Sequence, residues 1–211
     1  MKYTHILWDF NGTIINDVET GIISLNTLLK RRNMPTIDSV EQYHSVFTFP
    51  ITKYYENVGF DFSVEPYDKL AIEWVKENEI NIRKARLCDG AKEALDFFKS
   101  KNIPQIVISA TEVNMLRGHI EHLGITDYFE EILGLDNIHA ESKVKLGMDW
   151  LTRHPGAAPL MIGDTVHDAE VAKSIGCDCV LCSTGHQSLE TISRVGVPTF
   201  VNLEELIKGA F

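Results

Sequence analysis

Two segments of the sequence end an apolar run with an aspartate, as expected where a strand delivers a carboxylate to a functional site. The first, ILWDFNGT at residues 6–13, places Asp9 directly after apolar residues. The second, PLMIGDTVHD at residues 159–168, places Asp164 and then Asp168 after a similar run. Ligands of open α/β sheets bind outside the carboxyl ends of the strands. A carboxylate there is either a solvated turn or helix-cap residue, or a nucleophile or metal ligand.

Two further polar residues stand at the ends of elements between these segments. Ser109 closes the run PQIVIS, and Lys143 in SKVK precedes a predicted helix. Each residue alone is equally explained by a helix cap or a solvated face. A parallel sheet, however, would bring these strand ends to one edge, where Asp9, Asp164 and Asp168 would meet. Three carboxylates repel one another unless they are compensated, and Lys143 together with Mg²⁺, which prefers oxygen ligands, would supply the compensation.

The elements that must position these residues alternate along most of the chain. Apolar runs predict strands, which lie at residues 4–8, 105–109, 131–133, 159–162, 179–182 and 199–201. Between them, apolar residues recur with the spacing of a helix face. This alternation predicts an α/β protein with a Rossmann-like, doubly wound parallel sheet that is covered by helices on both faces.

Residues 16–83 interrupt this alternation because they contain no convincing strand. Apolar residues at helical spacing form one stripe over residues 18–29 and another over residues 67–75. We therefore expect a catalytic core made of residues 1–15 and 84–211, with an inserted α-helical cap domain at residues 16–83. A lid over the active site is the natural use of such an insert.

The composition excludes several classes of partner. The chain has 211 residues and a formal net charge of −10, which argues against nucleic acid or an anionic membrane as its partner. No apolar run reaches the roughly 18–20 residues of a membrane-spanning helix, and the N-terminal segment lacks the pattern of a signal peptide. The four cysteines are too few for a disulfide framework, and CDCVLC is better explained as a strand than as a metal site. These features predict a cytoplasmic protein.

Taken together, DFNGT, Ser109, Lys143 and GDTVHD resemble the four motifs of the haloacid dehalogenase superfamily of hydrolases. The similarity is to the subgroup like phosphoglycolate phosphatase, in which a helical cap follows the first strand, and it extends over essentially the whole chain. The first and fourth motifs are the specific ones, whereas the serine and the lysine are weak alone. The resemblance implies a magnesium-dependent phosphatase that hydrolyses a small phosphate monoester through an aspartyl-phosphate intermediate.

The resemblance also implies how the acidic residues act. Asp9 would be the nucleophile that attacks phosphorus. Asp9 and Asp164 would bind Mg²⁺ through their side chains, and residue Asn11 would bind it through its backbone carbonyl. Asp168 would not be a direct ligand of the cation, but would orient Lys143 or a metal-bound water.

A second set of residues would hold the phosphate and the substrate. The predicted phosphate contacts are the Ser109 hydroxyl, the Ala110 amide and Lys143, together with Gly12 and Thr13 of the first motif. Lys145 is an alternative to Lys143, which we prefer because it directly follows the loop. In the insert, VFTFPITKYY is the best candidate for a segment that enters the site, with Phe49 and Lys53 as substrate contacts.

One residue departs from the pattern of the family. Its phosphatases usually carry a second aspartate two residues after the nucleophile, which protonates the leaving group and then activates water. Here that residue is Asn11, and loss of a general acid–base typically costs about 10²–10⁴ in rate. Four explanations are open: a slow phosphatase, a substrate whose leaving group needs no proton, a residue substituted on purpose to trap a complex, or replacement by another group, with His139, His167 and His186 as candidates.

Two other functions stay open beside hydrolysis of a phosphate ester. Phosphonate-cleaving members of the superfamily have a small residue at the position of Asn11 and form a Schiff base with a cap lysine, for which Lys53 is the candidate. A non-catalytic protein that binds a phosphorylated ligand would also explain Asn11. The metal-free dehalogenases are disfavoured because they lack a metal-binding aspartate equivalent to Asp164.

Overall fold

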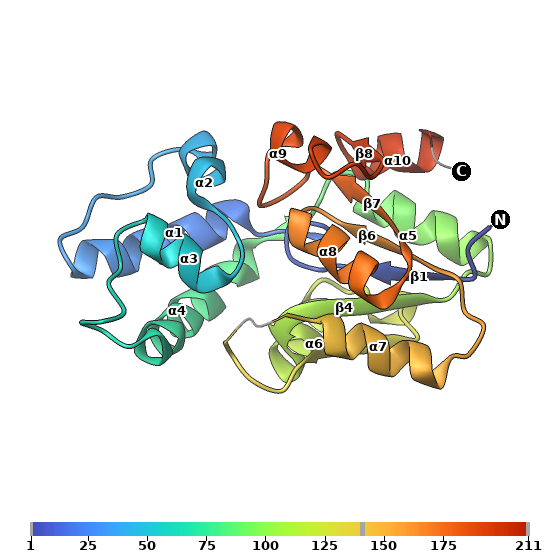
Figure 1. Ribbon diagram of the computed structural model, residues 1–211, viewed down its shortest axis with the longest axis horizontal. Coiled ribbons are helices and arrows are strands. Elements are labelled where there is room, and N and C mark those ends of the chain that lie inside the picture. Colours follow the sequence, from blue (N-terminus) through green and yellow to red (C-terminus); the bar gives the residue numbers. More distant parts are fainter. Residues whose placement is uncertain (1, 140–141, 210–211) are drawn as a thin grey trace.

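A parallel β-sheet forms the centre of the molecule, which is a computed structural model describing residues 2–139 and 142–209 (Figure 1). Within these residues, six strands pair in the order β5-β4-β1-β6-β7-β8, and every pair is parallel. The strands are β1 (His5–Trp8), β4 (Gln105–Glu112), β5 (Glu131–Leu135), β6 (Pro159–Gly163), β7 (Asp178–Cys182) and β8 (Thr199–Phe200). Each overlaps a run that the sequence predicted as a strand, so the predicted parallel sheet is confirmed.

Helices cover both faces of this sheet because successive strand residues point to opposite sides. Ile6 and Trp8 of β1 pack into the apolar cluster that contains α5 (Ala91–Ser100), α6 (Val113–His122) and α10 (Leu203–Gly209). Leu7 belongs to the cluster on the other face, which is built with α7 (Val144–Arg153), α8 (Val166–Ile175) and α9 (Leu189–Ser193). The core is therefore doubly wound, as the sequence predicted.

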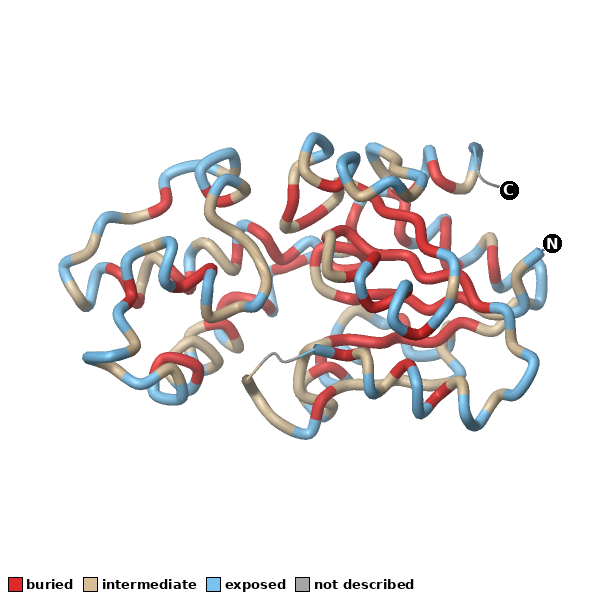
Figure 2. Tube along the Cα trace, viewed as in Figure 1, coloured by how far each residue is buried: buried red, intermediate tan, exposed pale blue. Residues whose placement is uncertain are grey.

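A separate helical lobe lies beyond one end of the sheet, away from both termini (Figure 1). We define the helical lobe by its helices, which are α1 (Val18–Arg31), α2 (Val40–Val46), α3 (Ile51–Asn57) and α4 (Tyr67–Asn81). Its buried side chains, among them Leu25, Leu28 and Leu70, form an apolar cluster of their own. Figure 2 shows buried positions concentrated on the sheet and again inside this lobe. We propose that it is the cap predicted over residues 16–83.

Two very short strands and two 3₁₀ turns complete the described elements. The strands β2 (Ile15–Asn16) and β3 (Arg86–Leu87) pair antiparallel where the chain leaves and re-enters the core. Strands of two residues have no periodicity that a sequence pattern could reveal. The 3₁₀ turns are η1 (Ile82–Lys84), which follows α4, and η2 (Thr126–Tyr128), which precedes β5.

Across residues 2–139 and 142–209, the structure contains no helix that combines the length and the apolar character needed to span a bilayer.

Candidate active site

The predicted site residues gather at the carboxyl edge of the sheet, beneath the helical lobe. Asp9 follows β1, Ser109 lies in β4, Asp164 follows β6, and Lys143 immediately precedes α7. All four line one cavity of about 170 Å³, and Asp168 of α8 lines it as well. The sequence therefore predicted correctly that parallel strands would bring these groups together.

Lys143 is buried between two carboxylates. Its ammonium donates to Asp9 Oδ1, lies 2.7 Å from Asp168 Oδ1, and donates to the Ile108 carbonyl at 3.2 Å. Its side chain is only 3% exposed. Burial alone would lower the pKa of Lys143, but the charges of Asp168 and Asp9 outweigh burial and raise it above its ordinary value. The alternative, Lys145, is 85% exposed and pairs with Asp149 on the surface.

Three buried carboxylates share the space around Lys143. One oxygen from each of Asp9, Asp164 and Asp168 lies within 4.8 Å of the other two. Burial raises the pKa of Asp9 to about 6, although Lys143 opposes this shift. Burial, together with the charges of Asp9 and Asp168, raises the pKa of Asp164 well above its ordinary value, although His186 opposes the shift. One ammonium against three carboxylates leaves negative charge uncompensated, so this oxygen donor set fits a hard divalent cation such as Mg²⁺.

Thr13 and Gly12 support the carboxylates and do not line the cavity. The Thr13 hydroxyl lies 3.2 Å from both Asp9 Oδ2 and Asp164 Oδ1. Gly12 has φ +74°, and a Cβ atom there would come within 2.3 Å of Asp164 Oδ2, so only glycine fits this turn. The Gly12 amide donates to Asp17 Oδ1 at 2.9 Å. The Gly12 amide and the Thr13 hydroxyl thus face carboxylates in this structure, and the contact of both residues with phosphate stays a prediction.

Asp168 holds its position through the start of α8. Its Oδ2 accepts hydrogen bonds from the Thr165 amide at 3.0 Å and from the Thr165 hydroxyl at 2.7 Å. The bond from the amide is one half of a capping box between Thr165 and Asp168. Its other oxygen faces Lys143. Burial alone would raise the pKa of Asp168, but Lys143 and Thr165 hold it below its ordinary value. The geometry therefore suits the orienting role that the resemblance implied.

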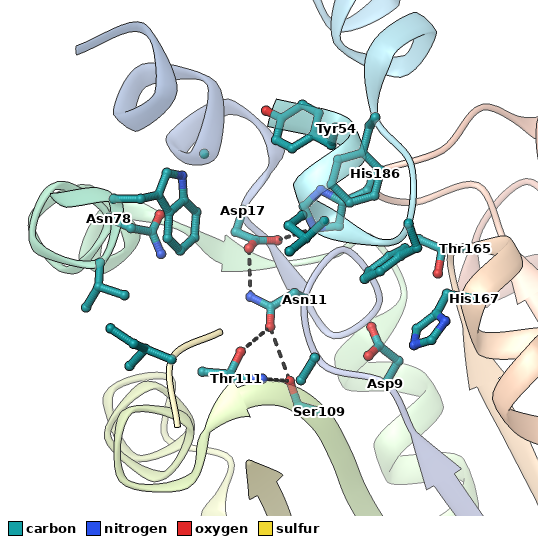
Figure 3. Close-up of a pocket in the computed structure, with 18 of the residues that line it drawn as sticks. Asp9, Asn11, Asp17, Tyr54, Asn78, Ser109, Thr111, Thr165, His167 and His186 are labelled. Carbon is teal, nitrogen blue, oxygen red and sulfur yellow. Dashed lines mark hydrogen bonds and ion pairs between the residues drawn. The ribbon is translucent and has the colours of Figure 1, made fainter. Parts of the chain in front are cut away.

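Asn11 lies at the junction of the core and the helical lobe (Figure 3). Its Oδ1 accepts from the Thr111 hydroxyl at 2.8 Å and from the Ser109 hydroxyl at 3.4 Å. Its Nδ2 donates to Asp17 Oδ2 at 2.8 Å. The carboxamide is thus oriented by a donor on one side and an acceptor on the other. Between Ile108 and Glu112, the register of β4 against β5 shifts, so the backbone around Ser109 departs from the regular ladder.

Sequence reasoning missed Asp17 and Thr111. Asp17 precedes α1 and reads as a helix cap, but its side chain makes no capping hydrogen bond and turns toward Asn11 and Gly12 instead. Thr111 lies two residues after Ser109, a spacing that was available in the sequence as a weak indication. Burial alone would raise the pKa of Asp17, but His186 and the hydrogen bonds from Asn11 and Gly12 keep it lowered.

His186 joins the core loop to the helical lobe. Its Nε2 lies 3.4 Å from Asp17 Oδ1, and its Nδ1 lies 2.8 Å from the Tyr43 hydroxyl on α2. Its backbone amide donates to Asp164 Oδ2 at 2.6 Å. Burial alone would lower the pKa of His186, but the charge of Asp17 raises it to about 9. The imidazolium is therefore charged at neutral pH, and both ring nitrogens face protein partners.

The residues predicted from the insert divide into two groups. Phe49 lines the cavity, and its ring stacks on His167, which also lines it, with the ring centroids 4.4 Å apart. Lys53 is 58% exposed, pairs with Glu56 at 3.1 Å, and is absent from the cavity lining. Its contact with substrate stays a prediction that this position does not favour, because the buried residues of α3 are Tyr54 and Tyr55. His139 lies outside this cavity, 3.5 Å from Asp68.

The side of the cavity formed by the helical lobe is predominantly apolar. It is lined by aromatic and aliphatic side chains, including Tyr43, Phe47, Phe49, Tyr54, Trp74 and Val75. Asn78 of α4 adds a neutral amide on this side (Figure 3). Of the described residues that line the cavity, Lys143 is the sole lysine or arginine.

Comparisons with known proteins agree with this geometry. Residues 6–182 match the family model described as haloacid dehalogenase-like hydrolase. A phosphoglycolate phosphatase from Photobacterium profundum is 29% identical over 135 residues, which cover 61% of this chain and 59% of that protein. A phosphoglycolate phosphatase from Chromobacterium violaceum is 23% identical, with coverage of 97% and 96%. The solved structure of a haloacid dehalogenase-like family hydrolase from Streptococcus pneumoniae superimposes with a TM-score of 0.83 at 17% identity, covering 100% of this chain and 99% of that one.

Proposed function

The chain belongs to the haloacid dehalogenase-like hydrolase family, and on that premise we propose that it is a magnesium-dependent phosphatase. It would hydrolyse a small phosphate monoester through an aspartyl-phosphate on Asp9. The observation that carries this proposal is the contact of Lys143 with Asp9 inside a cluster of three buried carboxylates. The names of the relatives from Photobacterium profundum and Chromobacterium violaceum support a phosphatase of the phosphoglycolate phosphatase type.

Asp9 and Lys143 would have different roles in the two steps of the proposed reaction. Asp9 Oδ2 would attack phosphorus, the bond from phosphorus to the ester oxygen would break, and the leaving group would depart with the electron pair. Water would then attack phosphorus, release inorganic phosphate and restore the Asp9 carboxylate. Covalent catalysis of this kind replaces one difficult step by two easier ones. Lys143 would stay protonated throughout and neutralise charge on Asp9 and the phosphoryl oxygens.

Other groups would position the phosphate and the cation. The Ser109 hydroxyl and the Ala110 amide line the cavity at the end of β4 and are proposed as donors to phosphoryl oxygens. Asp9, Asp164 and the backbone carbonyl of Asn11 would hold Mg²⁺. When bound, the cation lowers the repulsion between an anionic nucleophile and an anionic phosphate.

The Schiff-base alternative is less well supported by the lysines of the chain. A lysine must lose its proton to attack a carbonyl group, and the raised pKa of Lys143 keeps it charged. Lys53, the candidate in the insert, is exposed and ion-paired with Glu56. A protein that only binds phosphorylated ligands would not need a nucleophile in contact with a buried ammonium.

Release of inorganic phosphate from phosphate esters tests this proposal. We expect turnover with Mg²⁺ and none with EDTA. Asp164→Asn should reduce turnover and raise the Mg²⁺ concentration needed for half-maximal rate, because it removes one charged ligand. Asp178→Asn is the matched control, since Asp178 pairs with Lys2 at the surface. Equal rates with EDTA, or an Asp164→Asn variant as active as Asp178→Asn, would overturn the proposal.

A further inference from the structure

We infer that the substrate is an aryl phosphate, in which a neutral aromatic ring is bonded to the phosphate through a phenolic oxygen. This inference rests on the proposed function, because it assumes that Asp9 takes the phosphoryl group. It goes beyond that function by naming the leaving group. Two independent features support it: the uncharged, aromatic wall opposite Asp9, and the carboxamide of Asn11 at the point where the leaving group departs.

The distribution of charge excludes an anionic leaving group. Beyond Lys143, which Asp9 and Asp168 already hold, the described lining residues supply no lysine or arginine. Apart from tyrosines, the other titratable lining residues near the helical lobe are Asp17, Glu112 and three histidines, and each histidine already faces a carboxylate of the protein: His186 faces Asp17, His119 faces Glu79 and His167 faces Glu170. Burial of a substrate carboxylate here would leave it unpaired, which is costly. A substrate such as phosphoglycolate therefore lacks the partner that its second anionic group requires.

The shape and composition of the wall favour a flat ring. The side chains of Phe47, Tyr54 and Trp74 offer ring faces and edges, and Val75 adds an aliphatic surface. A pair of aromatic rings in contact is more stable than the apolar area that it buries would account for. The cavity of about 170 Å³ admits a small ligand only. Asn78 on α4 is 3% exposed and gives a neutral hydrogen-bonding group on this side, suited to an uncharged polar substituent (Figure 3).

Asn11 sets the chemistry of the leaving group. A carboxamide donates hydrogen bonds but does not release a proton at neutral pH, so Asn11 cannot protonate the ester oxygen as it departs. A phenol has a pKa near 10, like the tyrosine side chain, whereas the pKa of an alkyl alcohol is close to that of water, about 15.7. A phenolate is therefore a far better leaving group than an alkoxide when no acid is present.

The two titratable side chains nearest to Asn11, Asp17 and His186, are already paired with each other. Both oxygens of Asp17 are engaged, because they accept from Asn11 Nδ2 and the Gly12 amide, and Oδ1 also lies 3.4 Å from His186 Nε2. The ring nitrogens of His186 lie 3.4 Å from Asp17 Oδ1 and 2.8 Å from the Tyr43 hydroxyl. The step then balances without a protein acid: Asp9 bonds to phosphorus, the bond between phosphorus and the phenolic oxygen breaks, and the phenolate takes its proton from solvent.

A matched pair of substrates tests this inference. Phenyl phosphate and benzyl phosphate both carry one neutral ring, but only the first releases a phenolate. We expect kcat/KM for phenyl phosphate to exceed that for benzyl phosphate by about 10²-fold or more, the typical contribution of one general acid. Phosphoglycolate should be turned over more slowly than either. Asn11→Asp should raise the rate with benzyl phosphate more than the rate with phenyl phosphate, and so shrink the ratio between them.

The charge of the wall gives a second, separate test. Val75→Lys places an ammonium on the cavity side of α4, so it should raise kcat/KM for phosphoglycolate relative to phenyl phosphate. Ile72→Lys is the matched control, because Ile72 lies on the same helix, is 48% exposed and does not line the cavity. The control should leave the ratio unchanged while altering the net charge equally.

The outcomes separate this inference from the proposed function. Hydrolysis of phosphoglycolate faster than phenyl phosphate, or equal rates for the phenyl and benzyl esters, would overturn the aryl phosphate inference and leave the phosphatase standing. No magnesium-dependent hydrolysis of any ester, or rates that are unchanged in Asp9→Asn, would overturn the phosphatase itself. A preference for phenyl phosphate over phosphoglycolate that is reversed in Val75→Lys would support both the aryl phosphate inference and the phosphatase.

Discussion

The two sides of the cavity differ in almost every physical respect. The core side presents charged groups in fixed contact, with Lys143 between Asp9 and Asp168 and with Asp164 beside them. The side formed by the helical lobe presents rings and aliphatic groups with few polar atoms. The core side therefore suits a dianionic phosphoryl group and its cation. The lobe side suits a neutral, apolar leaving group.

The charged and the apolar groups of the cavity come from different elements of the fold. Groups that handle charge sit on strand ends and helix starts, where the sheet and the capping box of α8 fix their positions. The groups that would select the leaving group under our proposal sit on α2, α3 and α4 and their connections. The Tyr43–His186 contact is one of the few polar links between the two sides.

The largest effect is expected at Lys143. In Lys143→Met, Asp9 and Asp168 would lose their shared partner in a buried site, so the free energy of unfolding should fall by about 3–5 kcal/mol in EDTA. Urea denaturation measures this change. Lys145→Met is the matched control, because Lys145 pairs with Asp149 at the surface and should show no measurable loss. Equal stability of the two variants would contradict the charged core side described here.

A smaller effect is expected at the link between the two sides. Tyr43→Phe removes the hydroxyl that lies 2.8 Å from the charged ring of His186, so the free energy of unfolding should fall by about 1.5–3 kcal/mol. Tyr128→Phe is the control, because the Tyr128 hydroxyl bonds the exposed Asp96. If both variants are as stable as the parent chain, the contact between α2 and the loop at His186 does not exist in solution.

The smallest effect concerns an ion pair within the helical lobe. Arg32 bonds Glu65 at 2.7 Å, and hydrogen bonds from Arg32 lower the pKa of Glu65 to about 2. Because the pKa is lowered on folding, the stabilisation is present above the unfolded value near 4.5 and is lost as the pH falls toward 2.

Glu65→Gln should therefore be less stable than the parent chain at pH 6, and the difference should shrink progressively below about pH 4.5. Urea denaturation at several pH values measures it. Glu56→Gln, which changes an exposed pair with Lys53, is the control and should show no such trend. A difference between Glu65→Gln and the parent chain that is constant over this range would refute the coupling.

Much of the core side could be predicted from the sequence. Each strand is a short apolar run, and parallel pairing brings the ends of the strands to the same edge, which is why the sequence alone predicts that Asp9, Ser109 and Asp164 lie together. The position of Lys143 directly after a loop favours it over Lys145. In the structure, Lys143 is buried and Lys145 is exposed.

The lobe side was much less predictable. The tertiary fold decides which residues of a helix face a cavity in another unit, so Lys53 was chosen for its charge although it points to solvent. Asp17 was missed because its position before α1 has an ordinary explanation as a cap. The sequence predicts a phosphate contact for Gly12 and Thr13 but not that the Gly12 amide faces Asp17 and the Thr13 hydroxyl faces Asp9 and Asp164.

The most direct test of the central claim is to trap the phosphoryl group on Asp9. After mixing with phenyl phosphate and Mg²⁺, acid quenching and peptide mass spectrometry should find one phosphoryl group on the peptide that contains Asp9. Since Asn11 cannot activate water, the group should accumulate in the parent chain and less in Asn11→Asp. A peptide that stays unmodified while phosphate is released, or an equal phosphoryl signal in Asp9→Asn, would contradict the account.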